Sequence, residues 1–266
     1  MAYKFGPNKQ CIKRVRAITP TLIQAAADTA ANGVEIPVEH AEVFPTMLGW
    51  WRFTNRTAEG MLLLLDNGFT VEAMPMMRNL IGHAYAMNWL LDNGTAGMRA
   101  LRAYTENAQK SLADDVNNSW KLAEPLKVDV TAVVFADEAD EKLHNKLVGE
   151  LKVFPNLLIA YGNPAMYPVY RHHSTYAHTT AQTASAYLSE QDGRLGYHST
   201  AQHETDSDVV WVPVALIQAA KAISPLIKGD PMRKVVEHAI RDLGIPDDVF
   251  TFQRVAKKGR VPASPR

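Results

Sequence analysis

The sequence is poor in cysteine and lacks several motifs that would identify an enzyme class. Its 266 residues include one cysteine, Cys11, so a disulfide within the chain is excluded and a reducing cytoplasm is the expected location. It contains no Gly-rich phosphate loop, no Cys-x-x-Cys pair and no Gly-x-Ser-x-Gly turn. We therefore set aside Walker- and Rossmann-type nucleotide binding and hydrolases built on a nucleophile elbow.

Long apolar runs and strand patterns are also scarce. The longest apolar stretches, such as MLLLLDNGF and LIGHAYAMNWLL, are shorter than a membrane span, and the N-terminus has no run of signal-peptide length. We therefore expect no membrane association. Alternation typical of a strand is confined to VDVTAVVF, whereas helical periodicity dominates the rest. The sequence thus predicts an all-α fold, a multi-helix bundle with a polar seam between two core helices.

The formal net charge is zero, but basic residues gather at both ends. Residues 1–16 and residues 254–266 each carry five basic residues and no acidic one. Such ends are either solvated tails or contact nucleic acid or an acidic partner. We predict a basic N-terminal segment over residues 1–18, a single helical domain over 19–250, and a basic, disordered tail over 251–266.

Turn and cap residues predict where the helices begin and end. Asn-Gly follows a first alanine-rich helix, and the triplet Asp-Asn-Gly ends both the second helix, which Pro45 should kink, and the third. A turn-rich connection is expected over 154–168 and a polar loop over 193–208. We predict helices over 19–33, 37–69, 70–94, 95–120, 137–151, 168 to about 189, 209 to about 225, and 230–244.

One arginine lies in the most apolar of these helices. Between Ala73 and Leu91, the polar residues besides Arg78 are Asn79, His83 and Asn88. An unpaired buried charge is costly, so Arg78 either reaches out past the helix to solvent or points inward to polar groups of another helix. The stretch PVYRHHSTYAHTTAQ, residues 168–182, is the candidate partner.

That stretch concentrates hydrogen-bonding groups on adjacent helical turns. In a continuous helix Tyr170, Ser174 and His178 form an i, i+4, i+8 row, and Arg171 and His178 share a face. A histidine transfers protons near neutral pH, and an arginine holds phosphate through its fork of donors. Arg171, Ser174 and His178 are therefore candidate catalytic residues, supported by Arg78, Asn79, His83 and Tyr170. The row is equally compatible with a hydrogen-bond ladder packed in the core.

Metal binding is not expected from this helix alone. None of its histidines, His172, His173 and His178, are spaced i, i+4 as zinc ligands on one helix usually are. In the later polar loop, His198, His203, Asp206 and Asp208 could bind a metal, although such a loop is more often simply solvated. We predict no metal and no cofactor.

At these residues the sequence resembles the HEPN superfamily of helical bundles. Its ribonuclease members carry Arg, four to six intervening residues, and His; RHHSTYAH (Arg171 to His178) and RNLIGH (Arg78 to His83) match that spacing. The resemblance implies metal-independent RNA cleavage, dimerisation that brings two motifs together, and a role as a toxin or in phage defence. The five-residue spacing of Arg78 and His83 places them about 140° apart around a helix.

A second resemblance covers residues 40–190. It is to a family of uncharacterised bacterial all-helical proteins, with an arginine helix (here LLLLDNGFTVEAMPMMRNL) followed by a Tyr-x3-Ser-x3-His helix (here YRHHSTYAH). In that family a glutamate usually follows the arginine after three residues, where this chain has Gly82. His83, one residue on, is a candidate substitute.

Three hypotheses on function remain open at this stage. The first is a ribonuclease of HEPN type that acts on RNA, as a homodimer or with a protein partner such as an antitoxin. The second is a non-catalytic helical module that binds a small anion or nucleotide. The third is an interaction protein that binds a partner through an apolar surface formed by Trp50, Trp51 and the MPMM segment. Such residues at helical spacing more often belong to the core.

Overall fold

The fold is that of an all-α protein, as the sequence predicts. The computed structural model describes residues 3–131, 134–161, 163–246, 249–250 and 254. A two-stranded hairpin, β1 (Leu188–Gln191) and β2 (Arg194–Tyr197), is the β-structure in these ranges. The α-helices are α1 (Lys9–Ala31), α2 (Phe44–Asp66), α3 (Met74–Ser119), α4 (Glu138–Lys152), α5 (Phe154–Ala160), α6 (Met166–Thr175), α7 (Ala181–Ser185), α8 (Asp206–Val209), α9 (Trp211–Ile223) and α10 (Arg233–Leu243), with short 3-10 turns at Val38–His40, Glu124–Leu126 and Ser224–Leu226.

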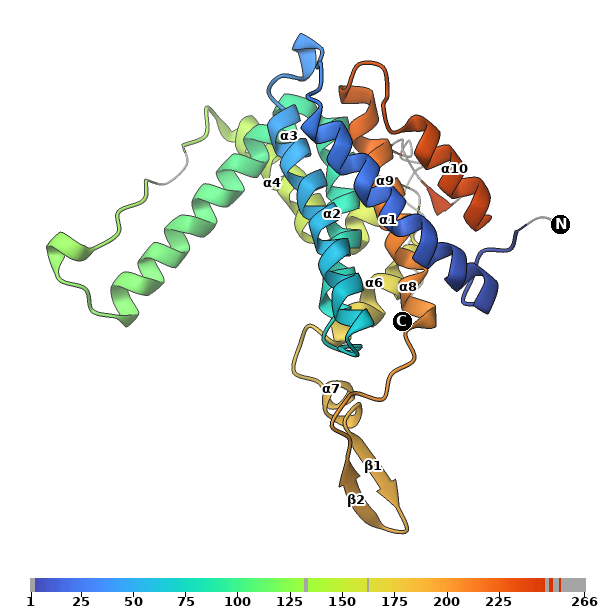
Figure 1. The fold of residues 1–266 in the computed structure, drawn as a ribbon. Helices are drawn as coiled ribbons and strands as arrows, with labels where there is room; N and C mark the ends of the chain where they lie inside the picture. The colour runs from blue at the N-terminus through green and yellow to red at the C-terminus, as the bar shows by residue number, and fades with distance from the viewer. Residues whose placement is uncertain (1–2, 132–133, 162, 247–248, 251–253, 255–266) are drawn as a thin grey trace, which may run out of the picture.

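Two helices form the centre of the bundle. The first half of α3 is buried almost without interruption from Ala84 to Leu90, and α9 from Val212 to Ala220. Helices that are apolar on all sides must be surrounded by other helices. Accordingly, α3 packs against α2 and α9, and α1 lies across α2, α9 and α10 (Figure 1).

Glycine explains how α2 ends and why α3 bends. Gly68 follows the end of α2 with φ of +81°, as expected for the first Asp-Asn-Gly triplet. At the second triplet the helix does not stop: α3 continues through a kink at Gly94, where φ is +50° and ψ is −133°. Beyond the kink, α3 leaves the bundle as a projecting arm, and the chain returns along it to α4 (Figure 1).

The first helix begins earlier than expected. Asn8 caps α1, accepting a hydrogen bond from Cys11 N at 2.9 Å, and the helix runs through Pro20. Cys11 and Val15 are fully buried. Much of the expected basic N-terminal segment is therefore part of a core helix that continues past residue 18. The division of the chain into domains stays a prediction.

The middle of the chain departs most from the expected helices. Pro45 lies in the first turn of α2, so it starts that helix and does not kink it. The expected turn-rich connection over 154–168 contains α5, which again has a proline in its first turn. The helix expected from 168 to about 189 ends at Thr175 and is followed by α7 and the hairpin, which turns at Asp192 and Gly193 with φ of 53° and 70°.

Within the expected tail, residues 251–266, the structure describes Arg254, which has well-defined contacts. Arg254 forms two 3.0 Å contacts with Glu150 and one of 2.7 Å with Asp92, which joins it to α4 and α3. Arg254 thus does not behave as part of a solvated tail. The rest of the expected tail, 251–253 and 255–266, lies outside the described residues.

One segment has the length and composition of a membrane span. It runs from Asp206 to Leu226, and 78% of its most apolar window is buried inside the bundle. The central position of α9 accounts for this apolar composition without a membrane. The expectation of no membrane association stays a prediction.

Candidate functional site

The helices expected to share a polar seam meet through Arg78 and Tyr170. Arg78 Nε donates to Tyr170 Oη at 3.1 Å, and the guanidinium carbon lies 5.4 Å from the centre of the tyrosine ring. The ring of Tyr170 stacks on Phe154 with 3.8 Å between centroids. Arg78 therefore points towards the polar helix α6. Within the described residues it has no carboxylate partner, so its charge is not neutralised by the protein there.

Arg78 borders a groove of about 270 Å³ that is lined by residues of α2, α3, α4, α5 and α6. Its walls combine aromatic rings with polar and basic side chains. At Gly82 no heavy atom of the described residues, apart from the neighbouring backbone of its own helix, lies within 4 Å of the position that a Cβ would take, so this part of the wall is open. The lining residues are Trp50, Arg78, Asn79, Gly82, His83, Ala86, Leu151, Lys152, Phe154, Leu157 and Tyr170.

His83 contributes a hydrogen-bond acceptor to this groove. Its Nδ1 lies 2.9 Å from the carbonyl oxygen of Asn79, a contact in which the ring nitrogen must donate. The ring packs against Phe53 and Trp50, with centroids 4.5 and 6.2 Å apart. Burial lowers the pKa of His83 below 6.5, against the opposing effect of the Asn79 hydrogen bond, so the ring is neutral at pH 7. Nε2 then carries the lone pair.

The structure does not assemble the three expected catalytic residues. Because α6 ends at Thr175, His178 lies beyond the helix and does not share a helical face with Arg171. Both side chains are exposed. Ser174 donates its hydroxyl to the backbone carbonyl of Tyr170 at 2.8 Å, so the expected side-chain row stops there. The four supporting residues, Arg78, Asn79, His83 and Tyr170, do come together, despite the angular separation of Arg78 and His83 on α3.

A second cluster joins α6 to the segment before α9. The carboxylate of Asp208 is 2% exposed, and ring nitrogens of three histidines lie within 4 Å of it. His203 Nε2 lies 2.8 Å from Oδ2, while His173 and His172 Nε2 lie 2.9 and 3.5 Å from Oδ1. The sequence offers His203 and Asp208 as possible loop ligands, but it does not predict that His172 and His173 lie beside them. No local signal in the sequence links these two groups.

The protonation of this cluster follows from its contacts. His173 Nδ1 lies 2.7 Å from the carbonyl oxygen of Val169 and so donates to it. A neutral ring of that tautomer would direct the lone pair of Nε2 at Asp208, which is repulsive. The cluster therefore needs an additional positive charge, carried either by an imidazolium or by a bound cation. Burial alone raises the pKa of Asp208, but the hydrogen bonds and charges of His173 and His203 outweigh it and hold that pKa below the usual value.

These shifts predict that stability falls as the solution is acidified. Burial lowers the pKa of His83 and His172 in the folded protein, so the unfolded chain takes up more protons below pH 6.5. The lowered pKa of Asp208 adds a further loss near its own titration, below about pH 4. Urea midpoints should therefore decrease from pH 7.5 to pH 5. The decrease should be smaller in His83→Gln than in His238→Gln, an exposed control on α10; equal slopes would contradict the assignment.

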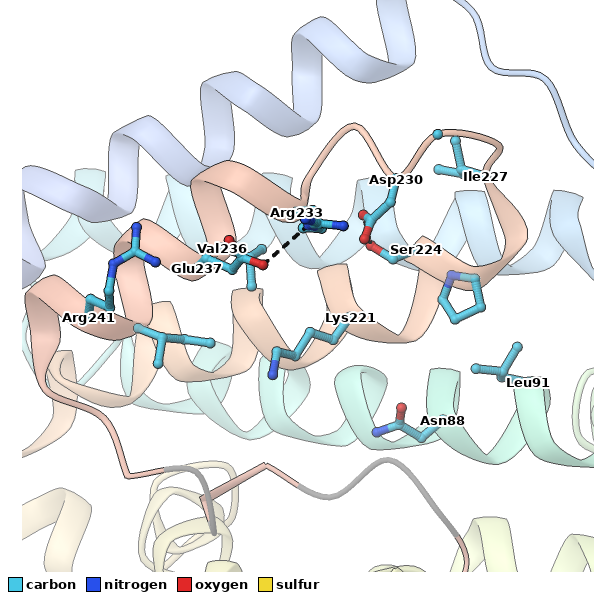
Figure 2. A pocket seen from close by; sticks show the side chains of 13 residues that line it. Asn88, Leu91, Lys221, Ser224, Ile227, Asp230, Arg233, Val236, Glu237 and Arg241 are labelled. Carbon is cyan, nitrogen blue, oxygen red and sulfur yellow. Dashed lines mark hydrogen bonds and ion pairs between the residues drawn. The ribbon is translucent and has the colours of Figure 1, made fainter.

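A larger cavity, of about 1000 Å³, lies between α3, α9 and α10, and three of its charged residues contact protein partners. Figure 2 shows Arg233 directed at Glu237, whose carboxylate is 3.3 Å from Arg233 Nε. Asp230 accepts a 2.7 Å hydrogen bond from Ser224. The smaller groove at Arg78 is the better candidate for an anionic ligand, because Arg78 is half-buried and has no described carboxylate partner, whereas Arg241 of the larger cavity is exposed.

Comparison with known proteins places the chain in a family without assigning a role to either cluster. No curated protein and no solved structure matches it. Residues 46–195 match the family described as a family of unknown function (DUF5677). The match spans α2 to the hairpin, which includes the groove at Arg78 and both histidines of α6 but neither His203 nor Asp208. Since it covers more than half of the chain, the protein belongs to the DUF5677 family.

Proposed function

We propose that the protein binds a small phosphate-bearing ligand with a planar ring, such as a nucleotide, in the groove at Arg78. The observation that carries the proposal is an arginine that is fixed from one side and has no described carboxylate partner. Tyr170 holds Nε, which leaves the terminal nitrogens of the fork for an anion. Lys152 adds a second positive charge at the rim.

The other walls suit the rest of such a ligand. Trp50, which is half-buried, offers aromatic surface on which a planar ring can stack. His83 presents an Nε2 acceptor that a ring amino group or a ribose hydroxyl can donate to. A volume of about 270 Å³ is close to the lower end of ordinary ligand pockets, which favours one nucleotide over a longer ligand.

Gly82 supports an external anion as the partner of Arg78. The resemblance to uncharacterised helical proteins implies a glutamate at this position, four residues after Arg78, which is the spacing of an ion pair on a helix. Here the glutamate is missing and the space is open. The chain has therefore kept the cation and lost the side chain that would neutralise it.

The test is nucleotide and phosphate binding by variants of this groove. With AMP, ATP and pyrophosphate as probes, the wild type should show a rise in melting temperature and a binding isotherm by calorimetry. Arg78→Gln should weaken binding about 10- to 100-fold, the equivalent of about 1.5–3 kcal/mol for a hydrogen bond to a charged group. Gly82→Glu should weaken it similarly through internal neutralisation, whereas Gly82→Gln should not.

Arg171→Gln is the matched control, because Arg171 is an exposed arginine on α6. Its affinity for the probes should equal that of the wild type. Failure of the wild type to bind any of the probes would refute the proposal. Loss of binding in Arg171→Gln but not in Arg78→Gln would return the site to the Arg171–His178 pair.

RNA cleavage is a second candidate, favoured by the neutral state of His83 beside a phosphate-binding arginine. A neutral imidazole can accept the proton of a 2′-hydroxyl as that oxygen attacks the adjacent phosphorus and the bond from phosphorus to the 5′-oxygen breaks. The 5′-oxygen takes a proton from water and leaves as a hydroxyl, and Arg78 can stabilise the charge that develops. The HEPN resemblance of RNLIGH is consistent with this role, within a toxin or phage-defence setting and with a homodimer or an antitoxin as partner. Cleavage should persist in EDTA, leave 2′,3′-cyclic phosphate ends, and vanish in His83→Ala; cleavage lost only in His178→Ala would place the base elsewhere.

A further inference from the structure

The cluster around Asp208 has the composition of a metal site. Two imidazole nitrogens and one carboxylate oxygen, from His172, His203 and Asp208, all lie within 4.8 Å of one another. Zinc and related ions bind these donors at about 2.0–2.1 Å, so tetrahedral ligand atoms are separated by about 3.3 Å. The distance of 3.5 Å from His172 Nε2 to Asp208 Oδ1 fits that value. His203 Nε2 lies 2.8 Å from the second carboxylate oxygen, Oδ2, and would give up that contact to bind an ion held by Oδ1.

A third imidazole, that of His173, contacts the same carboxylate. It is buried and rigidly oriented, because Nδ1 donates to the carbonyl of Val169. Its Nε2 lies 2.9 Å from the same Asp208 oxygen and has no hydrogen bond of good geometry in the described protein. A cation bound to this carboxylate would place positive charge where the lone pair of a neutral His173 ring and the carboxylate oxygen otherwise face one another.

The cluster is also accessible to an ion, and a neighbouring tyrosine ring limits the movement of its histidines. The side chain of His172 is 42% exposed, and that of His203 is 17% exposed, so an ion can enter without unfolding the bundle. The ring of Tyr176 lies 5.5 Å from that of His172 and 5.4 Å from that of His203 and limits their movement. The three ligands come from two separate segments, α6 and the chain around α8, which a metal would join.

We propose that His172, His203 and Asp208 bind a divalent transition-metal ion, with Zn²⁺ as the reference, and leave a fourth position open to water. Two histidines with one carboxylate form a donor set used for zinc and for non-haem iron, and the open position is the hallmark of sites that act on a ligand. The proposal is independent of nucleotide binding at Arg78, because none of its residues lines that groove.

The test is metal binding by the full chain, measured without reference to activity. Dialysis against Zn²⁺ followed by elemental analysis should give one ion per chain, and Co²⁺ should give the visible absorption of a low-coordinate site. His203→Ala and His172→Ala should each weaken Zn²⁺ binding at least 100-fold. His198→Ala, a change in the same polar loop outside the cluster, should leave affinity unchanged.

Both histidine variants remove partly exposed side chains, so they should stay folded, and circular dichroism of each will establish this. Affinity unchanged in folded His203→Ala and His172→Ala would overturn the proposal. So would a wild type that retains none of Zn²⁺, Co²⁺, Mn²⁺ and Fe²⁺ above background; Asp208 would then be balanced by an imidazolium alone. Loss of metal binding with nucleotide binding intact would separate this site from the proposed function.

Discussion

Replacing Asp208 with alanine is expected to lower the free energy of unfolding by about 3–5 kcal/mol, the range for removal of one partner of a buried ion pair. Asp208 is 2% exposed and is the common contact of His173 and His203. Without it, the fully buried Nε2 of His173 faces no compensating charge. The loss should exceed that of an ordinary surface change several-fold.

The measurement is urea denaturation at pH 7.5 in EDTA, so that metal binding does not contribute to stability. Asp206→Ala is the matched control, since Asp206 belongs to the same first turn of α8 but is exposed. Its effect should stay within about 0.5 kcal/mol, as for most surface substitutions. A loss below about 1 kcal/mol in Asp208→Ala would mean that the histidines find water or other partners and that the cluster is not a strong ion pair.

The loss of unfolding free energy in Asp208→Asn should lie between the losses in Asp208→Ala and Asp206→Ala. The amide keeps the size of the side chain and can donate to imidazole nitrogens, so packing is retained while the charge is lost. If Zn²⁺ binds as proposed, the wild type gains stability on addition of the metal and Asp208→Asn gains much less. The difference between the two proteins with and without Zn²⁺ then separates the ion pair from the metal site.

Local signals predicted the elements of this fold better than its helix lengths. The apolar run around Arg78 and the helix over VVWVPVALIQAAKAI are the two central helices, because unbroken burial leaves a composition that can be recognised without neighbours. The Asp-Gly pair at 192–193 is a strong hairpin signal, and the hairpin begins at Leu188, within the range expected to be helical. The end of α6 had no glycine or proline to mark it; there Thr175 and Thr180 bond to backbone carbonyls and compete with the helix.

The candidate sites differ in how far the sequence could define them. A lone arginine in an apolar helix must find polar company, and the contact between Arg78 and Tyr170 across 92 residues follows from that requirement. The pairing of His173 with Asp208 does not follow from any such rule, because many acids are available and only the packing of α6 beside α8 selects one. Arg171 and His178 were grouped on the assumption of a continuous helix, and that assumption was wrong.

The kink at Gly94 divides α3 into a core half and an arm. Two tryptophans, one in the core half and one at the end of the arm, differ in burial. Trp89 is fully buried, whereas Trp120, at the far end of the same helix, is 72% exposed. Trp89→Ala should cost about 3–5 kcal/mol of unfolding free energy through lost burial and a residual cavity. Trp120→Ala should change it by no more than about 0.5 kcal/mol.

Trp89→Phe tests whether the loss of unfolding free energy in Trp89→Ala comes from lost apolar burial. The indole nitrogen of Trp89 is buried and finds no hydrogen-bond partner in the described part of the chain, so the tryptophan is held by its apolar surface. Phenylalanine keeps most of that surface and removes an unsatisfied donor, so its loss should stay below about 1.5 kcal/mol. Urea denaturation followed by circular dichroism avoids the change in fluorescence that each substitution causes. Equal losses at Trp89 and Trp120 would mean that both halves of α3 are packed alike, and the core assigned to its first half would then be incorrect.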